Sequence, residues 1–580
     1  MPEPSRMMLR GKAVLAAGAI ATWSGATWSG AAWSQVPLPG VGWAPPALVL
    51  PTGEGASAPD VPAGRPGLSD YRGPPQLGEA SRSGVILAPG FADGLPDGRP
   101  GAPGRAYDIR PSIAARLLAT DNINQTATDR RGEFITGITP GLLISADTAR
   151  LRGILSYQPT GLLYSNDSSQ SRILHDFNGQ GVLTLLPETL FLDLRGAAGT
   201  QAVGGGFAPQ SAPLVNRQGM LQTWSFQASP YYVHRFEDFA TLQLGYGFQA
   251  VQQSLGGNAS NALTPTGQPF FSDSRYVANS VFATLRTGPN FGRLAMEGRI
   301  VSTDYSGNGI FDGAYRRTAV VEARYSFTRQ VAVLVEGGYE MQRYSTIPRF
   351  ELSEPIWAVG TRLTLSPESV VTFKYGRREG ADAPTLNAVI ALGGRTRLFA
   401  SYSERLSSSA QRAVDLLSAT TLDALGNPVD AFTGAPILRP FADSFFGTQG
   451  GLQRIRQGTV TISQSWPRDT IFLTGSAQRI IPVAAAPGNA GFAQTGYSAT
   501  LTWSHALSPV TTINASAQYG WLERTGFSAG PVYGGSLAVV RELTPRLNVF
   551  AQYSLTSRDD AARGGRAIQN TILVGLRQSF

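Results

Sequence analysis

The chain ends on NTILVGLRQSF (570–580), a short stretch with the residue spacing of a β-strand. Ile572, Val574 and Leu576 share one parity, whereas Arg577 lies on the other. Because successive side chains of a strand point to opposite faces, this segment would have one apolar and one largely polar face. A soluble sheet can share that pattern, so the fold depends on whether the rest of the chain repeats it.

The same alternation runs through most of the chain, in segments of roughly 9–15 residues. Two examples are YRRTAVVEARYSF (315–327) and RLNVFAQYSLT (546–556). Ten very short turns with the sequences typical of turns join the segments in pairs, and longer polar connections separate the pairs. The ten turns account for twenty strands, and terminal strands at 107–118 and 567–580 bring the prediction to about 22.

Short turns at one end and long loops at the other are typical of an outer-membrane β-barrel. Each segment is long enough to cross a bilayer at a tilt, which takes roughly 9–11 residues. Because a membrane offers no water to an open sheet edge, the sheet must close. The predicted fold is therefore all-β, a transmembrane antiparallel β-barrel of about 22 strands in the outer membrane of a Gram-negative bacterium. A soluble propeller or solenoid is the alternative, but no repeated motif of fixed sequence supports it.

The composition agrees with a barrel better than with soluble domains. Charged residues make up 15% of the chain, against about 25% in ordinary globular proteins. The absence of cysteine excludes a disulfide scaffold and a thiolate metal site. The net charge is +8, and lysine occurs only at Lys12 and Lys374. The arginine excess is compatible with codon bias or with an anion-attracting surface or lumen, and charge alone does not decide between them.

The N-terminus has the features of a secretory signal peptide. Three basic residues, Arg6, Arg10 and Lys12, stand first. The apolar run AVLAAGAIAT (13–22) follows them, and small residues come next. This order predicts a signal peptide at 1–34, which is removed when the protein leaves the cytoplasm.

The next segment, 35–105, is rich in proline and glycine. Such a composition cannot bury enough apolar surface to fold alone. We therefore expect a disordered periplasmic leader at 35–105, followed by the barrel domain at 106–580.

The opening stretch now has a place as the last strand of the barrel. Its terminal Phe580 resembles the mark that the barrel-assembly machinery of the outer membrane recognises, so we predict that Phe580 is an assembly signal. Gln578 departs from the aromatic or apolar residue that is usual at its position.

Strand parity assigns a set of charged residues to the lumen, because a charge facing lipid at mid-bilayer costs about 2–4 kcal/mol. These residues can form a ladder of opposite charges across neighbouring strands, a polar track for a hydroxyl-rich or acidic substrate, or both. Gln518 and Gln552 would suit sugar hydroxyls, as they would any watery channel. The predicted pore-lining set is Arg150, Arg152, Arg286, Glu297, Arg299, Glu322, Arg324, Glu336, Glu340, Arg362 and Lys374.

No catalytic site is evident from the sequence. The three histidines, His175, His234 and His505, stand in no recognisable nucleophile or metal motif. We expect turn or interface histidines, a protein that is not an enzyme, and no cofactor.

The longest connection, 407–451, is unusually rich in phenylalanine for an exposed loop. Its phenylalanines are Phe432, Phe441, Phe445 and Phe446. We expect this loop to fold inward or over the mouth of the barrel and to narrow the pore.

The first barrel segments resemble a known family. ATDN (119–122) and RGEFITGITPGL (131–142) are similar to the opening of a β-barrel porin family whose members often accompany exopolysaccharide-synthesis genes, including those of exosortase-type systems. SYQPTGLLYSND (156–167) and LPETLFLDLRGAAGTQ (186–201) fit as well. The resemblance covers roughly 107–200 and elsewhere extends only to architecture. It implies an outer-membrane protein associated with a surface polysaccharide and carries no catalytic residues.

Several functions stay open at this point. The first is a channel for export or passage of an exopolysaccharide, and the second is a general diffusion porin for small hydrophilic solutes. An energised importer would suit 22 strands with a plugged lumen, but the predicted leader cannot supply a folded plug. A structural anchor in the envelope is the last.

These functions imply different lumens and partners. A polysaccharide channel should have a continuous track of aromatic and paired polar residues on one lumenal wall, and a general porin should have segregated acidic and basic arcs. The expected partners are outer-membrane lipid and lipopolysaccharide, the barrel-assembly machinery, and polysaccharide or small hydrophilic solutes, with no nucleic acid.

Overall fold

The computed structural model describes residues 106–203, 220–255, 269–366, 369–422, 428–430, 447–526, 529–560 and 565–580. The predicted signal peptide (1–34) and leader (35–105) lie outside the described residues, so both stay predictions.

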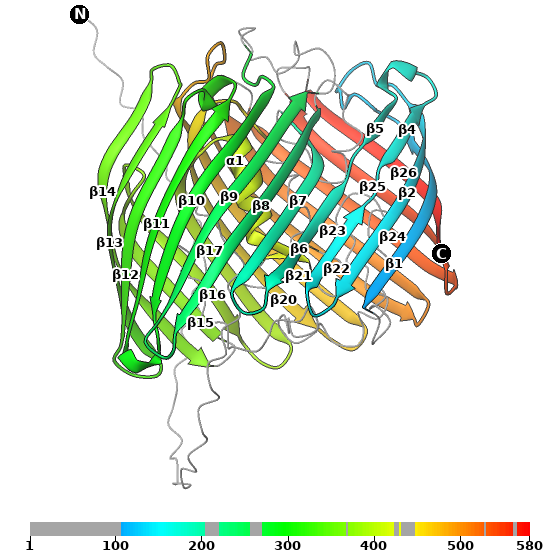
Figure 1. The fold of residues 1–580 in the computed structure, drawn as a ribbon. Helices are drawn as coiled ribbons and strands as arrows, with labels where there is room; N and C mark the ends of the chain where they lie inside the picture. The colour runs from blue at the N-terminus through cyan, green and yellow to red at the C-terminus, as the bar shows by residue number, and fades with distance from the viewer. Residues whose placement is uncertain are drawn as a thin grey trace, which may run out of the picture. The chain divides into compact units, whose positions relative to one another are not determined.

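Nearly all described residues belong to long antiparallel strands (Figure 1). The alternation of apolar and polar residues favours strands because each strand buries one face and exposes the other. The strands of the wall are β1 (Tyr107–Thr120), β2 (Glu133–Asp147), β3 (Leu151–Tyr157), β4 (Thr160–Tyr164), β5 (Arg172–Leu174), β6 (Phe177–Leu186), β7 (Leu190–Ala202), β8 (Met220–Phe236), β9 (Ala240–Leu255), β10 (Ser274–Thr287), β11 (Leu294–Gly307), β12 (Tyr315–Ser326), β13 (Val331–Tyr344), β14 (Phe350–Ser366), β15 (Ser369–Arg378), β16 (Ala381–Ala391), β17 (Thr396–Ser407), β20 (Leu452–Ser465), β21 (Asp469–Ala484), β22 (Gln494–Ser508), β23 (Thr511–Arg524), β24 (Gly530–Thr544), β25 (Leu547–Asp560) and β26 (Gly565–Ser579).

Short elements lie between these strands. They are the 3-10 turns η2 (Ser168–Gln170), η6 (Pro289–Phe291) and η7 (Gly309–Phe311), the helix α1 (Ser409–Ala419), and a small hairpin of β18 (Thr420–Leu422) with β19 (Pro428–Asp430).

The sheet closes on itself, because β1 pairs with β2 on one side and with β26 on the other. Both β3 and β4 pair with β2, so they are two halves of one crossing. In the same way β6 pairs with β3 and β5 pairs with β4. The 24 hydrogen-bonded strands, less these two interruptions, make 22 crossings among the described residues. The prediction of an antiparallel barrel of about 22 strands is confirmed.

The final stretch of the chain completes the ring. In β26, Thr571 pairs with Thr120 and Ser579 pairs with Ser112. The amide of Phe580 donates to the carbonyl of Pro111 at 3.0 Å, and its side chain is 63% exposed. Its predicted role as an assembly signal stays a prediction.

The outer surface of the barrel is apolar. Ile300, Val321 and Val335 alternate with inward residues and are exposed at mid-strand, as is Leu501 on β22. Exposed tyrosines follow one another across β22–β25, with Tyr519 and Tyr533 directly paired. Because a continuous apolar belt around a barrel would be unfavourable in water, this belt is the surface that contacts lipid. The chain is an outer-membrane β-barrel, and the end with long loops is the extracellular one.

Among the described residues, no helix is both long enough and apolar enough to traverse a membrane.

The extracellular half of the lumen holds part of the longest loop. In Figure 1 α1 lies inside the ring of strands. Ser409 Oγ donates to Gln253 Oε1 of β9 at 2.9 Å, and Gln411 Nε2 donates to the hydroxyl of Tyr344 of β13 at 2.8 Å. Ala410 and Val414 pack in a buried cluster with Tyr276 and other inward residues of β9–β13.

The loop 407–451 is expected to fold inward, and its described start, which contains α1, does so. The phenylalanines of that expectation, Phe432, Phe441, Phe445 and Phe446, lie outside the described residues.

Candidate functional site in the lumen

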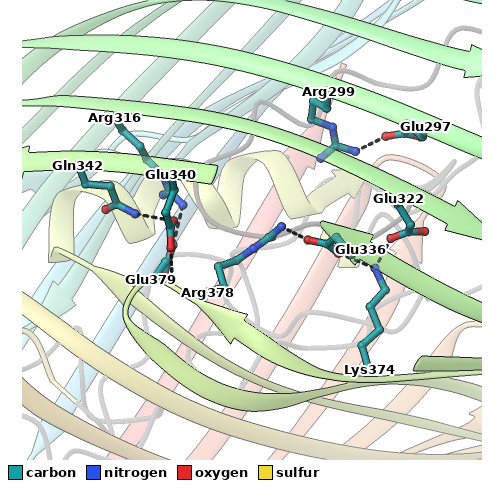
Figure 2. Close-up of polar contacts among 10 residues, drawn as sticks. All are labelled: Glu297, Arg299, Arg316, Glu322, Glu336, Glu340, Gln342, Lys374, Arg378 and Glu379. Atoms are coloured by element: carbon teal, nitrogen blue, oxygen red, sulfur yellow. Dashed lines mark hydrogen bonds and ion pairs between the residues drawn. The ribbon is translucent and has the colours of Figure 1, made fainter. Parts of the chain in front are cut away.

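One inner face of the barrel, on β10–β15, is strongly charged (Figure 2). Three carboxylates, Glu297, Glu322 and Glu336, lie side by side in one row across β11, β12 and β13. Like charges directly opposite one another destabilise a sheet unless cations intervene. The cations that surround this row therefore hold the face together.

The first carboxylate of the row lies between two guanidinium groups. Arg286 Nε of β10 lies 2.6 Å from Glu297 Oε2, and Arg299 Nη2 lies 2.5 Å from Glu297 Oε1. Arg286 is the direct cross-strand partner of Glu297, whereas Arg299 is two residues further along β11. This end of the row is thus neutralised by its own strand and by the neighbouring strand.

The other two carboxylates share one lysine. Lys374 reaches from β15 over β14 and contacts both Glu322 and Glu336, the latter at 3.2 Å. Arg378, also on β15, contacts Glu336 from the other side (Figure 2). The lysine stem needs an empty space on β14, and Gly360 supplies it, because a Cβ there would lie 2.8 Å from Lys374 Cγ.

A second cluster surrounds Glu379, which follows β15 directly. Arg316 Nη2 of β12 donates to Glu379 Oε1 at 2.6 Å, and the amide of Glu379 donates to the Glu340 carboxylate of β13. The amide of Leu406 on β17 donates to Glu379 Oε2, and Arg454 Nη2 of β20 donates to the Glu379 carbonyl at 2.8 Å. One residue therefore ties β12, β13, β17 and β20 together.

The local sequence explains why Glu379 points inward. Glu379 and Gly380 alone connect β15 to β16, and both have positive φ, 54° and 75°. A two-residue turn with two positive φ values is the hairpin connection that suits the twist of the strands, and glycine favours it. The sequence predicts a longer polar connection at 380–383, but the chain turns back at once and β16 begins at Ala381.

The structure brings together only part of the predicted pore-lining set. Arg152 on β3, Arg324 on β12 and Arg362 on β14 stand at inward positions of their strands, whereas Arg150 is exposed in the turn between β2 and β3. That these residues line the route of a solute stays a prediction. The residues that join in the clusters described above are Arg286, Glu297, Arg299, Glu322, Glu336, Glu340 and Lys374.

The sequence reasoning missed four charged members of the clusters, Arg316, Arg378, Glu379 and Arg454. Arg316 has the parity of Glu322 on the same strand, so that signal was available. Arg378 likewise shares the parity of Lys374. Glu379 lies in the turn, where strand parity gives no direction.

A second inner face, on β21–β25, carries hydroxyl and amide groups at mid-height, and its inward charges, Arg524, Glu542 and Arg558, stand towards the strand ends. Ser476 and Ser498 lie 2.7 Å apart through their hydroxyls, as do Ser516 and Ser536. Asn514 is 5% exposed, and neither its Oδ1 nor its Nδ2 has a hydrogen-bond partner in the part of the chain that the structure describes. An amide can both donate and accept hydrogen bonds, and both of these atoms are buried in this structure.

The three histidines lie apart from both faces. His505 Nδ1 is 2.8 Å from Asp469 Oδ1, and His175 Nδ1 is 3.0 Å from the hydroxyl of Tyr157. His234 lies by Tyr232 near the end of β8. The described residues contain no group of three or more His, Asp and Glu side chains placed to hold a metal ion.

Solved outer-membrane receptors have similar folds. The chain is 9% identical to the ferric-catecholate import receptor Fiu of E. coli K12, with a TM-score of 0.43 over 83% of this chain and 82% of that one. It is 12% identical to the ferripyoverdine receptor of Pseudomonas aeruginosa, with a TM-score of 0.43 over 82% of this chain and 72% of that one. A likeness of this size concerns the fold alone and gives no information about the transported solute.

No family model matches the chain. No curated protein matches it either.

Proposed function

We propose that the protein is an outer-membrane channel that passes an exopolysaccharide along the inner face of β21–β25. The observation that carries the proposal is the chemistry of that face, which at mid-height is uncharged and rich in hydroxyl and amide groups. Each hydroxyl both donates and accepts a hydrogen bond, and each amide offers both kinds of group, so they match the hydroxyls of a sugar.

The hydroxyl and amide groups form a continuous track. Thr474, Ser476 and Gln478 follow one another at every second position of β21, and Asn514, Ser516 and Gln518 do so on β23. The paired serines connect neighbouring strands at mid-height. Phe472 and Phe550 add buried aromatic rings at inward positions towards the short-turn end. This is the kind of wall that a polysaccharide channel needs.

The charged face supports the same proposal by its arrangement. A general porin should have separate acidic and basic arcs, but on β10–β15 each carboxylate of the row contacts a cation. The charges are therefore largely neutralised by one another and hold a wall in shape. The resemblance of roughly 107–200 to a family that accompanies exopolysaccharide genes favours a polysaccharide as the solute.

The test is single-channel conductance of the refolded full chain in planar bilayers, with and without a long-chain acidic polysaccharide. We expect a low conductance that the polysaccharide blocks or modulates. Polyethylene glycol of matched hydrodynamic size serves as the control, because it fills the pore without a row of hydroxyls. A large, steady conductance that ignores the polysaccharide would instead identify a general diffusion porin.

A further inference from the structure

The wall of the barrel contains a seam in its extracellular half. β16 pairs with β17 only from Leu386 to Ala391, opposite Tyr402 to Arg397. β17 continues to Ser407 and stays paired with β20 on its other side. Above Tyr402, β17 therefore has no ladder pairing with β16 within the described residues. Pro384, which has no N–H to donate, stands on β16 just above the last pair.

The other side of the seam is the upper part of β14. The hairpin of β15 and β16 is short, so β14 pairs with β15 only from Trp357 downward. From Ile356 up to Phe350 the strand has its partner β13 alone. The backbone groups of such edges need hydrogen-bond partners, either other groups of the chain or water. What closes the seam is therefore a functional question.

Glu379 closes it from the tip of the hairpin. Its carboxylate accepts from the Leu406 amide, on the part of β17 that does not pair with β16, and from Arg316 on β12. The side chain is 2% exposed, so the contact is sealed from solvent. Leu406 itself packs in the same buried cluster as Tyr305 and Tyr344, which are inward residues of β11 and β13.

The seam has a second closure above Glu379. Ile347, between β13 and β14, and Ala485, just after β21, exchange two backbone hydrogen bonds, of 3.0 and 3.3 Å. Strands far apart around the ring thus meet in the extracellular half of the lumen. They are held there by the Glu379 contacts, by this short bridge and by the apolar cluster that contains Leu406, Tyr305 and Tyr344.

We propose that this seam is the gate of the channel and that Glu379 is its latch. With Glu379 bound to Arg316 and to the edge of β17, the walls of β11–β13 and β17–β20 are held together and the lumen is pinched. Release of Glu379 leaves polar groups on both sides, which water can solvate, and it separates Leu406 from the apolar cluster that contains Tyr305 and Tyr344. The two-residue turn at Glu379 and Gly380 is where the backbone moves. The gate rests on the proposed channel function, but not on the identity of the solute.

The lack of cysteine in the chain allows a clean test. Residues that exchange both hydrogen bonds in an antiparallel pair have Cα atoms about 5.5 Å apart, which suits a disulfide. In the double variant Ile347→Cys and Ala485→Cys, oxidation should hold the seam shut and reduce the open probability at least tenfold. A reducing agent should restore it.

The second variant, Glu379→Gln, removes the charge that Arg316 binds and should raise the open probability at least tenfold. Asp193→Asn is the matched control, because Asp193 is also 2% exposed and pairs with an arginine, Arg195 at 3.0 Å, but both lie on β7, away from the seam. Its gating should stay like that of the wild type.

Each outcome decides at least one of the two proposals, the gate and polysaccharide passage. If the oxidised double variant gates like the reduced one, or if Glu379→Gln gates like Asp193→Asn, the gate is wrong. If gating follows both predictions while no polysaccharide blocks the open channel, the gate stands and polysaccharide passage fails. If wild type and variants all lack conductance, both proposals fail.

Discussion

The two inner faces of the barrel differ in how their polar side chains find partners. Both follow strands with the same alternation and the same apolar outer side. On β10–β15, however, long charged side chains reach across strands and neutralise one another. On β21–β25, short hydroxyls make local pairs, and Asn514 keeps both polar atoms unused by the described residues. Under the proposed function, the wall whose charges neutralise one another is the support, and the wall of short hydroxyl and amide groups contacts the solute.

The largest effect should come from removing the lysine that the charged face shares. Lys374→Met leaves Glu322 and Glu336 directly opposed and partly buried. Removing one partner of a buried ion pair costs about 3–5 kcal/mol. Urea unfolding of the barrel in lipid vesicles should show a loss of this size, and adding Glu322→Gln should recover part of it. A Lys374→Met barrel as stable as the wild type would show that the row is not held by its cations.

Substitutions on the outer surface should destabilise the barrel equally behind either inner face. Ile300 is 62% exposed behind the charged face, and Leu501 is exposed behind the uncharged one. Ile300→Arg and Leu501→Arg should each lower the free energy of unfolding in vesicles by about 2–4 kcal/mol, because both place a charge in lipid near mid-bilayer. If one of the two substitutions were harmless, that part of the wall would not face lipid.

The smallest effect on stability should come from the uncharged face. Asn514→Leu removes polar atoms that have no partner among the described residues. Replacing an unsatisfied buried amide by an apolar group of similar shape is close to neutral, within about 1 kcal/mol. We expect unchanged unfolding and ion conductance but a shorter block by polysaccharide. A destabilisation as large as that of Lys374→Met would mean that Asn514 is structural.

Much of the fold is readable from the sequence because period two and turn chemistry are local signals. They predict the strand count and the inward direction of Glu297 and Lys374. They do not show that Glu322 and Glu336 lie opposite each other, because the register between two strands is set only when the strands pair.

The sequence does not predict the role of Glu379, for a related reason. Its role depends on a turn of two residues and on contacts with four distant strands. The helix α1 was likewise expected only as a loop, because its burial depends on the inward side chains of β9 and β13. Both features are set by the closed barrel and have no local pattern of their own.

The most direct test of the central claim is to ask which face a polysaccharide covers. Thr500 on β22 and Thr318 on β12 are half-buried threonines at inward positions of the uncharged and the charged face. In a chain without cysteine, Thr500→Cys and Thr318→Cys allow the rate of labelling by a water-soluble thiol reagent to be compared, with and without polysaccharide. The account predicts that polysaccharide slows labelling at Thr500→Cys and leaves Thr318→Cys unchanged. Equal protection at both sites, or protection only at Thr318→Cys, would contradict it.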